Sequence, residues 1–189
     1  VASAVVTRGF LLYANTFQAG FYFDDNSAIV NNPAIKDITN LKAIWNGFNT
    51  RFFAGITFSL NYALGRLDPF GYRLFNVIFH SMTALLVYFL VLLTFQTPAM
   101  RDTSLAASAR TIALFSGILF LVHPIQTQGV NIIWQRVATL ATFFYVATLF
   151  LYVKGRLTSR FSYFVGAWMT ALLGMFTKEI TLTLPLVLL

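Results

Sequence analysis

The chain of 189 residues contains no cysteine and only six carboxylate side chains. The lack of cysteine excludes disulfides, thiolate-bound metals and a cysteine nucleophile. Charged residues make up only 10% of the chain, whereas a soluble domain carries about a quarter. Because hydrophobic residues account for 58% of the chain, its composition is that of a membrane protein.

Familiar nucleotide-binding and metal-binding motifs are also absent. No GxxxxGK[ST], GxGxxG or HExxH pattern occurs, and the only histidines, His80 and His123, lie far apart in the sequence. Two distant histidines do not indicate a zinc site. A soluble nucleotide donor therefore has no recognisable binding loop in this chain.

The charges that are present are mostly positive, with a formal net charge of +7. In a soluble protein this excess would suggest nucleic acid, but here short basic loops separate apolar runs, and no nucleic-acid partner is expected. Five basic residues lie in the loops 96–110 and 154–160: Arg101, Arg110, Lys154, Arg156 and Arg160. Short basic loops stay on the cytoplasmic side, so the opposite ends of the spans face outward.

Long uncharged runs predict an all-α fold, a polytopic membrane bundle of about six spans. The expected spans are 1–19, 71–95, 111–123, 129–153, 161–177 and 180–189 onward, with an outer loop at 20–70. The last two could instead form one long helix, since only three residues separate them. The chain starts without Met and ends within an apolar run, so we expect it to be a piece of a longer protein.

The outer loop is expected to contain helices that lie along the membrane interface. Leu41, Ile44, Trp45 and Phe48 recur at the spacing of one helical face. The segment 51–66 has 14 uncharged residues between its terminal arginines, too few for a comfortable span. Both segments therefore favour amphipathic interfacial helices.

Polar side chains form stripes in the outer halves of two expected spans. One stripe contains Tyr72, Asn76, His80 and Thr83, and the other contains Gln128, Asn131, Gln135, Thr139 and Thr142, with Arg136 beside it. Together they predict a water-filled cavity, although hydrogen bonding between helices is the alternative. The predicted lining residues are Asn76, His80, His123, Gln126, Gln128, Asn131, Gln135 and Glu179.

Asp24 and Asp25 lie side by side at the outer end of the first expected span. A helix cap or Asx turn would need only one of them, whereas an aspartate can also act as a general base. A departing phosphate would need a cation, and the candidates are Arg136, Arg51 and Lys178. Lys178 and Glu179 could equally form a neutralised helix end.

This combination predicts a lipid-linked phosphosugar as the donor. Two carboxylates form only an incomplete metal site, so the dependence on a divalent metal stays open.

Five motifs occur in an order typical of one known group: FDDNSAIVNNPAI, the segment from Arg51 to Asn61-Tyr62, LDPFGYRLFNVIFH, HPIQTQGVNIIWQR and TKEITLTLP. The chain resembles the N-terminal membrane half of the TPR-containing GT-C glycosyltransferases. These are similar to the transmembrane-and-TPR O-mannosyltransferases of animals and, more distantly, to protein O-mannosyltransferases.

The resemblance implies a membrane enzyme that transfers a sugar, with inversion, from a polyprenyl-phosphate donor. The acceptor would be a protein Ser/Thr or a cell-surface glycan or lipid, and Asp24 or Asp25 would be the catalytic base. A TPR region is expected beyond Leu189. Two alternatives from other classes are a noncatalytic membrane scaffold with a TPR tail and a transporter.

The chain departs from the animal pattern at Gln126 and Gln128, where animal members often have His and Glu. This difference favours a bacterial or archaeal plasma membrane over the endoplasmic reticulum. It also implies that donor or acceptor specificity differs from that of the animal proteins.

Overall fold

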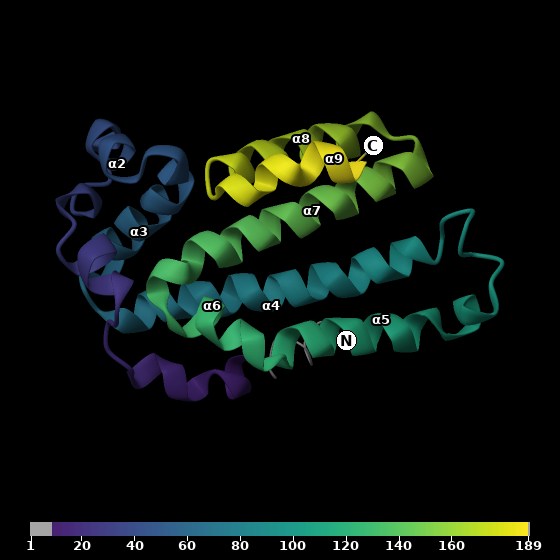
Figure 1. The fold of residues 1–189 in the computed structure, drawn as a ribbon, viewed down its shortest axis with the longest axis horizontal. Coiled ribbons are helices and arrows are strands. Elements are labelled where there is room, and N and C mark those ends of the chain that lie inside the picture. Colours follow the sequence, from purple (N-terminus) through teal and green to yellow (C-terminus); the bar gives the residue numbers. More distant parts are fainter. Residues whose placement is uncertain (1–8, 189) are drawn as a thin grey trace.

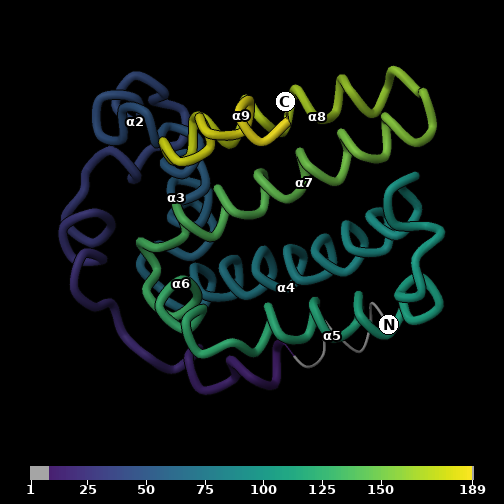
Figure 2. The backbone as a smooth tube through the Cα atoms, turned by 45° about the vertical axis from the view of Figure 1, so that its right-hand side comes forward, coloured from purple at the N-terminus to yellow at the C-terminus, as the bar shows by residue number. Residues whose placement is uncertain are grey.

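The computed structural model describes residues 9–188, and all regular elements within that range are helical. Four long helices lie side by side: α4 (Pro69–Thr94), α5 (Ala109–Val122), α7 (Arg136–Thr158) and α8 (Phe161–Met175) (Figure 1). Their directions alternate along the chain (Figure 2). The connections from α4 to α5 and from α7 to α8 lie at one end of the bundle, and the connection from α5 to α7 lies at the other end. The predicted all-α membrane bundle is confirmed.

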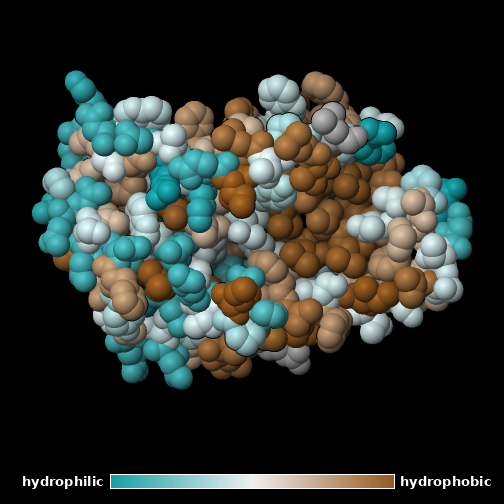
Figure 3. Space-filling model, in the orientation of Figure 1, coloured by the Kyte–Doolittle hydropathy of each residue, from teal (hydrophilic) through white to brown (hydrophobic). Residues whose placement is uncertain are grey.

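Three helical stretches are long and apolar enough to cross a membrane: Pro69–Thr94, Ser104–Val122 and Ile133–Thr158. The apolar helices Phe161–Met175 and Glu179–Leu188 are shorter. Hydrophobic residues cover much of the face over the long helices, whereas hydrophilic residues gather at the two ends (Figure 3). Large apolar side chains such as Phe161 and Trp168 are exposed along α8, as expected for contact with lipid.

The span predicted at 129–153 differs from the observed helix at its start. Residues Thr127–Asn131 form a separate short helix, α6, and Ile132 is extended with φ −85° and ψ 117°. A 3₁₀ turn at Ile133–Gln135 then leads into α7. Arg136 therefore lies in the first turn of α7, not two turns into a span.

The remaining predicted spans also have different bounds in the structure. Of the first span, 1–19, residues 1–8 lie outside the described part, and Ala14–Gln18 form a 3₁₀ helix. After α8 the backbone is extended at Lys178, with φ −159° and ψ 143°. The 3₁₀ helix Glu179–Thr183 and α9 (Leu184–Leu188) follow, so residues 161–188 do not form one continuous helix.

The predicted helices of the outer loop are present as α2 (Leu41–Phe48) and α3 (Phe52–Gly65). The Asn40 side chain caps α2 by accepting the Ala43 N–H at 3.0 Å. Asp68 caps α4 in the same way by accepting the Phe70 N–H at 3.0 Å, with Pro69 at the first helical position.

The two outer-loop helices form a core with the ends of the long helices. Ile44, Phe48 and Phe58 are buried together with Tyr72 of α4 and Ile133. The ring of Phe58 stacks on the ring of Trp134 with centroids 5.9 Å apart. The outer loop is therefore a packed cap on the bundle, anchored by burial of apolar surface.

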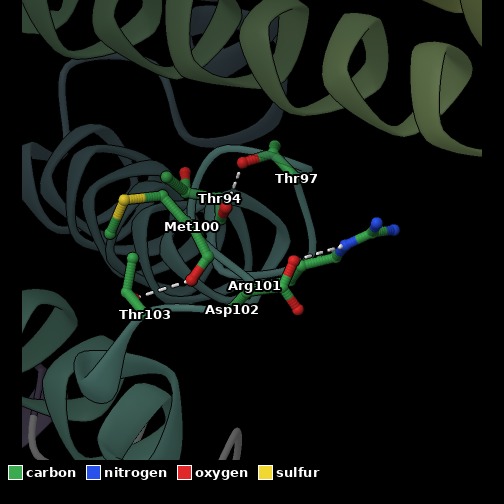
Figure 4. Close-up of polar contacts among 6 residues, drawn as sticks. All are labelled: Thr94, Thr97, Met100, Arg101, Asp102 and Thr103. Atoms are coloured by element: carbon green, nitrogen blue, oxygen red, sulfur yellow. Dashed lines mark hydrogen bonds and ion pairs between the residues drawn. The ribbon is translucent and has the colours of Figure 1, made fainter.

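The two basic loops lie at the end of the bundle that is opposite to this cap (Figure 1). Local bonds close the loop between α4 and α5, where the Thr97 hydroxyl donates to the Thr94 carbonyl and the Thr103 hydroxyl to the Met100 carbonyl, both at 2.7 Å (Figure 4). The exposed pair Arg101–Asp102, at 3.2 Å, contributes little to stability because water screens it.

This arrangement predicts the outcome of a labelling experiment, since the chain has no cysteine of its own. Cysteines introduced at Ser104 and Ser159 should resist an impermeant thiol reagent in intact cells, because both positions lie at the basic end. A cysteine at Asn32, in the outer loop, should react. Reaction at Ser104 and Ser159 with protection at Asn32 would reverse the orientation.

Candidate functional site

Asp24 is exposed at the end of the bundle that lies opposite the two basic loops. Within residues 9–188 its side chain has no hydrogen bond or ion pair, whereas its main-chain carbonyl accepts the Ser27 hydroxyl at 3.2 Å. Phe23, immediately before it, is 82% exposed and has a φ of 46°. Positive φ is uncommon for a bulky residue, so the backbone beside Asp24 is strained.

Asp25, by contrast, is fully buried. One carboxylate oxygen accepts the N–H of Trp134 at 2.7 Å, and the other accepts the N–H of Ile133 at 3.3 Å. The second oxygen also accepts the N–H of Tyr22 at 3.2 Å. The two adjacent aspartates therefore differ sharply, since one is open to solvent and the other is bound to backbone amides.

The amides of Ile133 and Trp134 are the first N–H groups of the helical stretch that contains α7. Such groups have no partner within their own helix, and they attract negative charge. Asp25 thus caps a helix that begins 108 residues later in the chain. The sequence suggests a local cap, but the capped helix is a distant one.

Arg73, in the second turn of α4, is fully buried and contacts the same region. Its two terminal nitrogens donate to the carbonyls of Ala19 and Gly20, and its Nε donates to the carbonyl of Asn131 at 3.4 Å. Arg73 is not among the site residues predicted from the sequence. Its spacing of three residues from Asn76 is the signal that could have placed it on the polar stripe.

Arg136, the first residue of α7, is fully buried and contacts α3 and α4. Its guanidinium donates to the carbonyl and hydroxyl of Thr57, at 3.1 and 3.3 Å, and to the carbonyl of Tyr72 at 2.9 Å. The rings of Phe58 and Phe75 lie 4.5 and 4.3 Å from its central carbon. Its predicted contact with a donor phosphate stays a prediction, and in this structure protein groups surround the guanidinium.

Asn76 joins these buried groups into one set. Its carbonyl oxygen accepts the Nε–H of Arg136 at 3.0 Å, and its amide donates to the carbonyls of Val130 and Ile132, at 3.3 and 3.5 Å. We call Asp25, Arg73, Asn76 and Arg136 the outer polar network. Through Asp25, Arg73 and Asn76, the network binds backbone groups of every residue from 130 to 134.

Arg51, Lys178 and Glu179 lie where α3 meets the end of α8. The Arg51 guanidinium is 3.6 Å from the Glu179 carboxylate and stacks over Trp134 with its central carbon 5.7 Å from the ring centroid. The Thr50 hydroxyl donates to the same carboxylate at 3.1 Å. A hydrogen bond from its own backbone N–H, aided by Thr50 and Arg51, lowers the pKa of the Glu179 carboxyl.

The two predicted stripes meet at a small cavity of about 60 Å³. Its lining residues are His80, Thr83, Phe120, Gln126, Gly129, Ala138, Thr139 and Thr142. The His80 Nε2 lies 3.1 Å from the carbonyl oxygen of Leu121. Such a space holds about two water molecules, which is far less than a sugar requires.

The other predicted lining residues do not border this cavity. His123 and Gln128 are exposed, and the His123 Nδ1 accepts the N–H of Ile125 at 3.2 Å. Gln135 and Asn131 are half-buried. No group of three or more potential metal ligands occurs among the described residues 9–188.

Comparison with known proteins places the chain in a family. It is 31% identical over 157 residues to the protein O-mannosyl-transferase TMTC3 of Mus musculus, which covers 76% of this chain. It is 31% identical over 173 residues to tmtc2 of Xenopus laevis and 29% identical over 190 residues to Tmtc1 of Drosophila melanogaster. These matches cover 85% and 92% of the chain.

The chain belongs to the TMTC-like family. This confirms the resemblance found in the sequence motifs. The TMTC-like chain spans only 16%, 19% and 20% of the length of these three relatives. No family model matches it, and no solved structure matches it either.

These three relatives are animal proteins, from mouse, frog and fly. They give no support for the preference for a bacterial or archaeal membrane that was drawn from Gln126 and Gln128. The helices that can span a membrane do support an integral membrane protein.

The outer polar network predicts a large effect for Asn76→Leu. Arg136 would stay buried after losing one acceptor, so the free energy of unfolding should fall by roughly 2–4 kcal/mol. Urea unfolding of the purified protein in detergent micelles measures this change.

Thr142→Val is the matched control on the neighbouring stripe. Thr142 is exposed, and within residues 9–188 its hydroxyl bonds only to the Ala138 carbonyl of its own helix, at 2.9 Å. Its effect should stay within about 0.5 kcal/mol. Equal small effects of both substitutions would contradict the structural importance of the network.

Proposed function

We propose that this TMTC-like chain is the N-terminal membrane part of a GT-C glycosyltransferase that uses a polyprenyl-phosphate sugar as donor. The observation that carries the proposal is the contrast between exposed Asp24 and buried Asp25. A base must reach an acceptor from the aqueous side, and only Asp24 of the pair is open to solvent. Asp25 fixes the backbone on which Asp24 sits.

In the proposed reaction, the Asp24 carboxylate takes the proton of an acceptor hydroxyl. The hydroxyl oxygen forms a bond to the anomeric carbon of the sugar while the bond from that carbon to the phosphate oxygen breaks. The electron pair leaves with the polyprenyl phosphate, and attack from the opposite face inverts the configuration. A positioned general base contributes about 10²–10⁴-fold to such a step.

The leaving phosphate needs a cation near the outer membrane face. We propose Arg51 and Lys178 for this role, because both lie in the cluster at the end of α8 and neither is fully buried. Glu179 binds Arg51 in this structure, so a phosphate would compete with that carboxylate for the guanidinium. We propose that Arg136 supports the site mainly through its bonds to Thr57, Tyr72 and Asn76.

Similarity to proteins named protein O-mannosyl-transferases supports a sugar-transferring role and a protein hydroxyl as the acceptor. We therefore propose mannose as the first sugar to test and Ser/Thr of a protein as the first acceptor. The proposal puts transfer at the membrane face that carries Asp24, opposite the basic loops. A TPR region beyond the chain stays part of the proposal.

The direct test is sugar transfer from a polyprenyl-phosphate-mannose donor to a Ser/Thr-containing peptide by the purified full-length protein. Asp24→Asn keeps the size of the side chain but removes the base, so turnover should fall by roughly 10²-fold or more. The unfolding temperature should not change, because the Asp24 carboxylate is exposed and has no hydrogen bond or ion pair within residues 9–188.

Two further variants define the interpretation. Asp25→Asn should lower the unfolding temperature together with turnover, because an amide cannot accept all three N–H groups. Asp102→Asn, at the opposite end of the bundle, should change neither quantity. Near-normal turnover of a folded Asp24→Asn/Asp25→Asn double variant would refute the catalytic assignment and favour the scaffold alternative.

A further inference from the structure

Arg73 is a buried cation that the proposed reaction does not use. It has no exposed surface, and it takes part in no ion pair within residues 9–188. Burying an arginine without a counter-ion is costly unless its donors find partners. A hydrophobic side chain would fill the same space without that cost, so the partners of the guanidinium indicate its role.

Those partners belong to two segments that are far apart in the chain. The terminal nitrogens bind the carbonyls of Ala19 and Gly20, and Nε binds the carbonyl of Asn131 at 3.4 Å. The face of the guanidinium also packs on Tyr22, with 5.4 Å between the central carbon and the ring centroid. The planar fork of an arginine suits such a junction, since its five donors have fixed directions.

Asp25 connects the same two segments by the opposite type of contact. Arg73 donates hydrogen bonds to the carbonyls of residues 19, 20 and 131. Asp25 accepts hydrogen bonds from the amides of residues 22, 133 and 134. The segment 19–25 is therefore held at its start by a cation and at its end by an anion. Asp24 lies inside this doubly held segment, next to the strained backbone of Phe23.

We infer that Arg73 is a positioning residue for Asp24, acting through the carbonyls of Ala19 and Gly20. This inference rests on the proposed function, because the position of Asp24 matters for transfer only if Asp24 is the base. Without the guanidinium, residues 19 and 20 lose their polar attachment to α4 and α6, while Phe21 still packs on Tyr72 and Asp25 still caps α7. The helices should then stay in place while the Asp24 carboxylate moves relative to the acceptor. A displacement of about 1 Å can reduce a rate by about 10²-fold.

The test combines kinetics with hydrogen exchange on the full-length protein in lipid nanodiscs. Arg73→Met fills the space without donors, so kcat should fall about 10- to 100-fold while KM for the polyprenyl-phosphate-mannose donor stays within about 2-fold. Exchange at the amides of Tyr22 and Asp25 should become faster, and exchange along α7 should not change.

Arg73→Lys is the conservative variant and keeps the test decisive where Arg73→Met does not fold. A lysine can reach one of the carbonyls, so both kcat and amide protection should lie between wild type and Arg73→Met. Arg66→Gln is the matched control, because Arg66 is exposed at the same end and, among the described residues, its guanidinium stacks only on Tyr62, at 5.2 Å. It should behave as wild type in both measurements.

The outcomes separate this inference from the proposed function. Unchanged protection at Tyr22 and Asp25, or wild-type kcat in a folded Arg73 variant, would overturn the positioning role while Asp24→Asn remains inactive. Wild-type turnover of Asp24→Asn would instead refute the proposed base, and the positioning role would fail with it. Loss of protection along α7 in Arg73→Lys would indicate general destabilisation and would also overturn the inference.

Discussion

The start of α7 depends on a carboxylate that the helix does not contain. Asp25 accepts the N–H groups of Ile133 and Trp134, which would otherwise be unsatisfied in an apolar environment. With those amides bound, the chain can turn sharply at Ile132 and enter α7 with Arg136 in the first turn. Arg136 in turn binds backbone groups of α3 and α4. The outer cap, α4 and α7 are thus joined through one chain of polar contacts.

The outer polar network contains two arginines and one aspartate, all fully buried. Its excess positive charge is stabilised by carbonyl dipoles and aromatic faces. Arg136 binds two backbone carbonyls and lies over Phe58 and Phe75, while Arg73 binds three backbone carbonyls. Such groups solvate a guanidinium without neutralising it. The charged members of the network therefore sum to one positive charge at the same end of the bundle as Asp24.

The sequence predicted the class of fold well because lipid imposes a simple rule. Uncharged runs must be helical, and the basic loops lie between them at one membrane face. The positions of α4, α5 and α8 can therefore be predicted from the sequence. The predicted start of the span at residue 129 differs by several residues from the start of α7 at Arg136. Hydrophobicity does not change at Ile132, and the interruption of the helix there depends on the distant Asp25. Arg73 was not predicted as a site residue for the same reason, because its role depends on the distant carbonyls of Ala19 and Gly20. Contacts between segments more than 50 residues apart leave no local periodicity.

The long separation between Asp25 and α7 has a consequence for how the protein is made. Asp25 leaves the ribosome 108 residues before its partner Ile133, so during synthesis its carboxylate has no α7 amide to bind until that part of the chain is made. The hairpin of α4 and α5 lies within residues 69–122, so it can form before α7 is made. Only when the chain reaches α7 can the carboxylate leave water and close the outer cap. We therefore expect the segment around Asp24 to acquire its final geometry late in biogenesis.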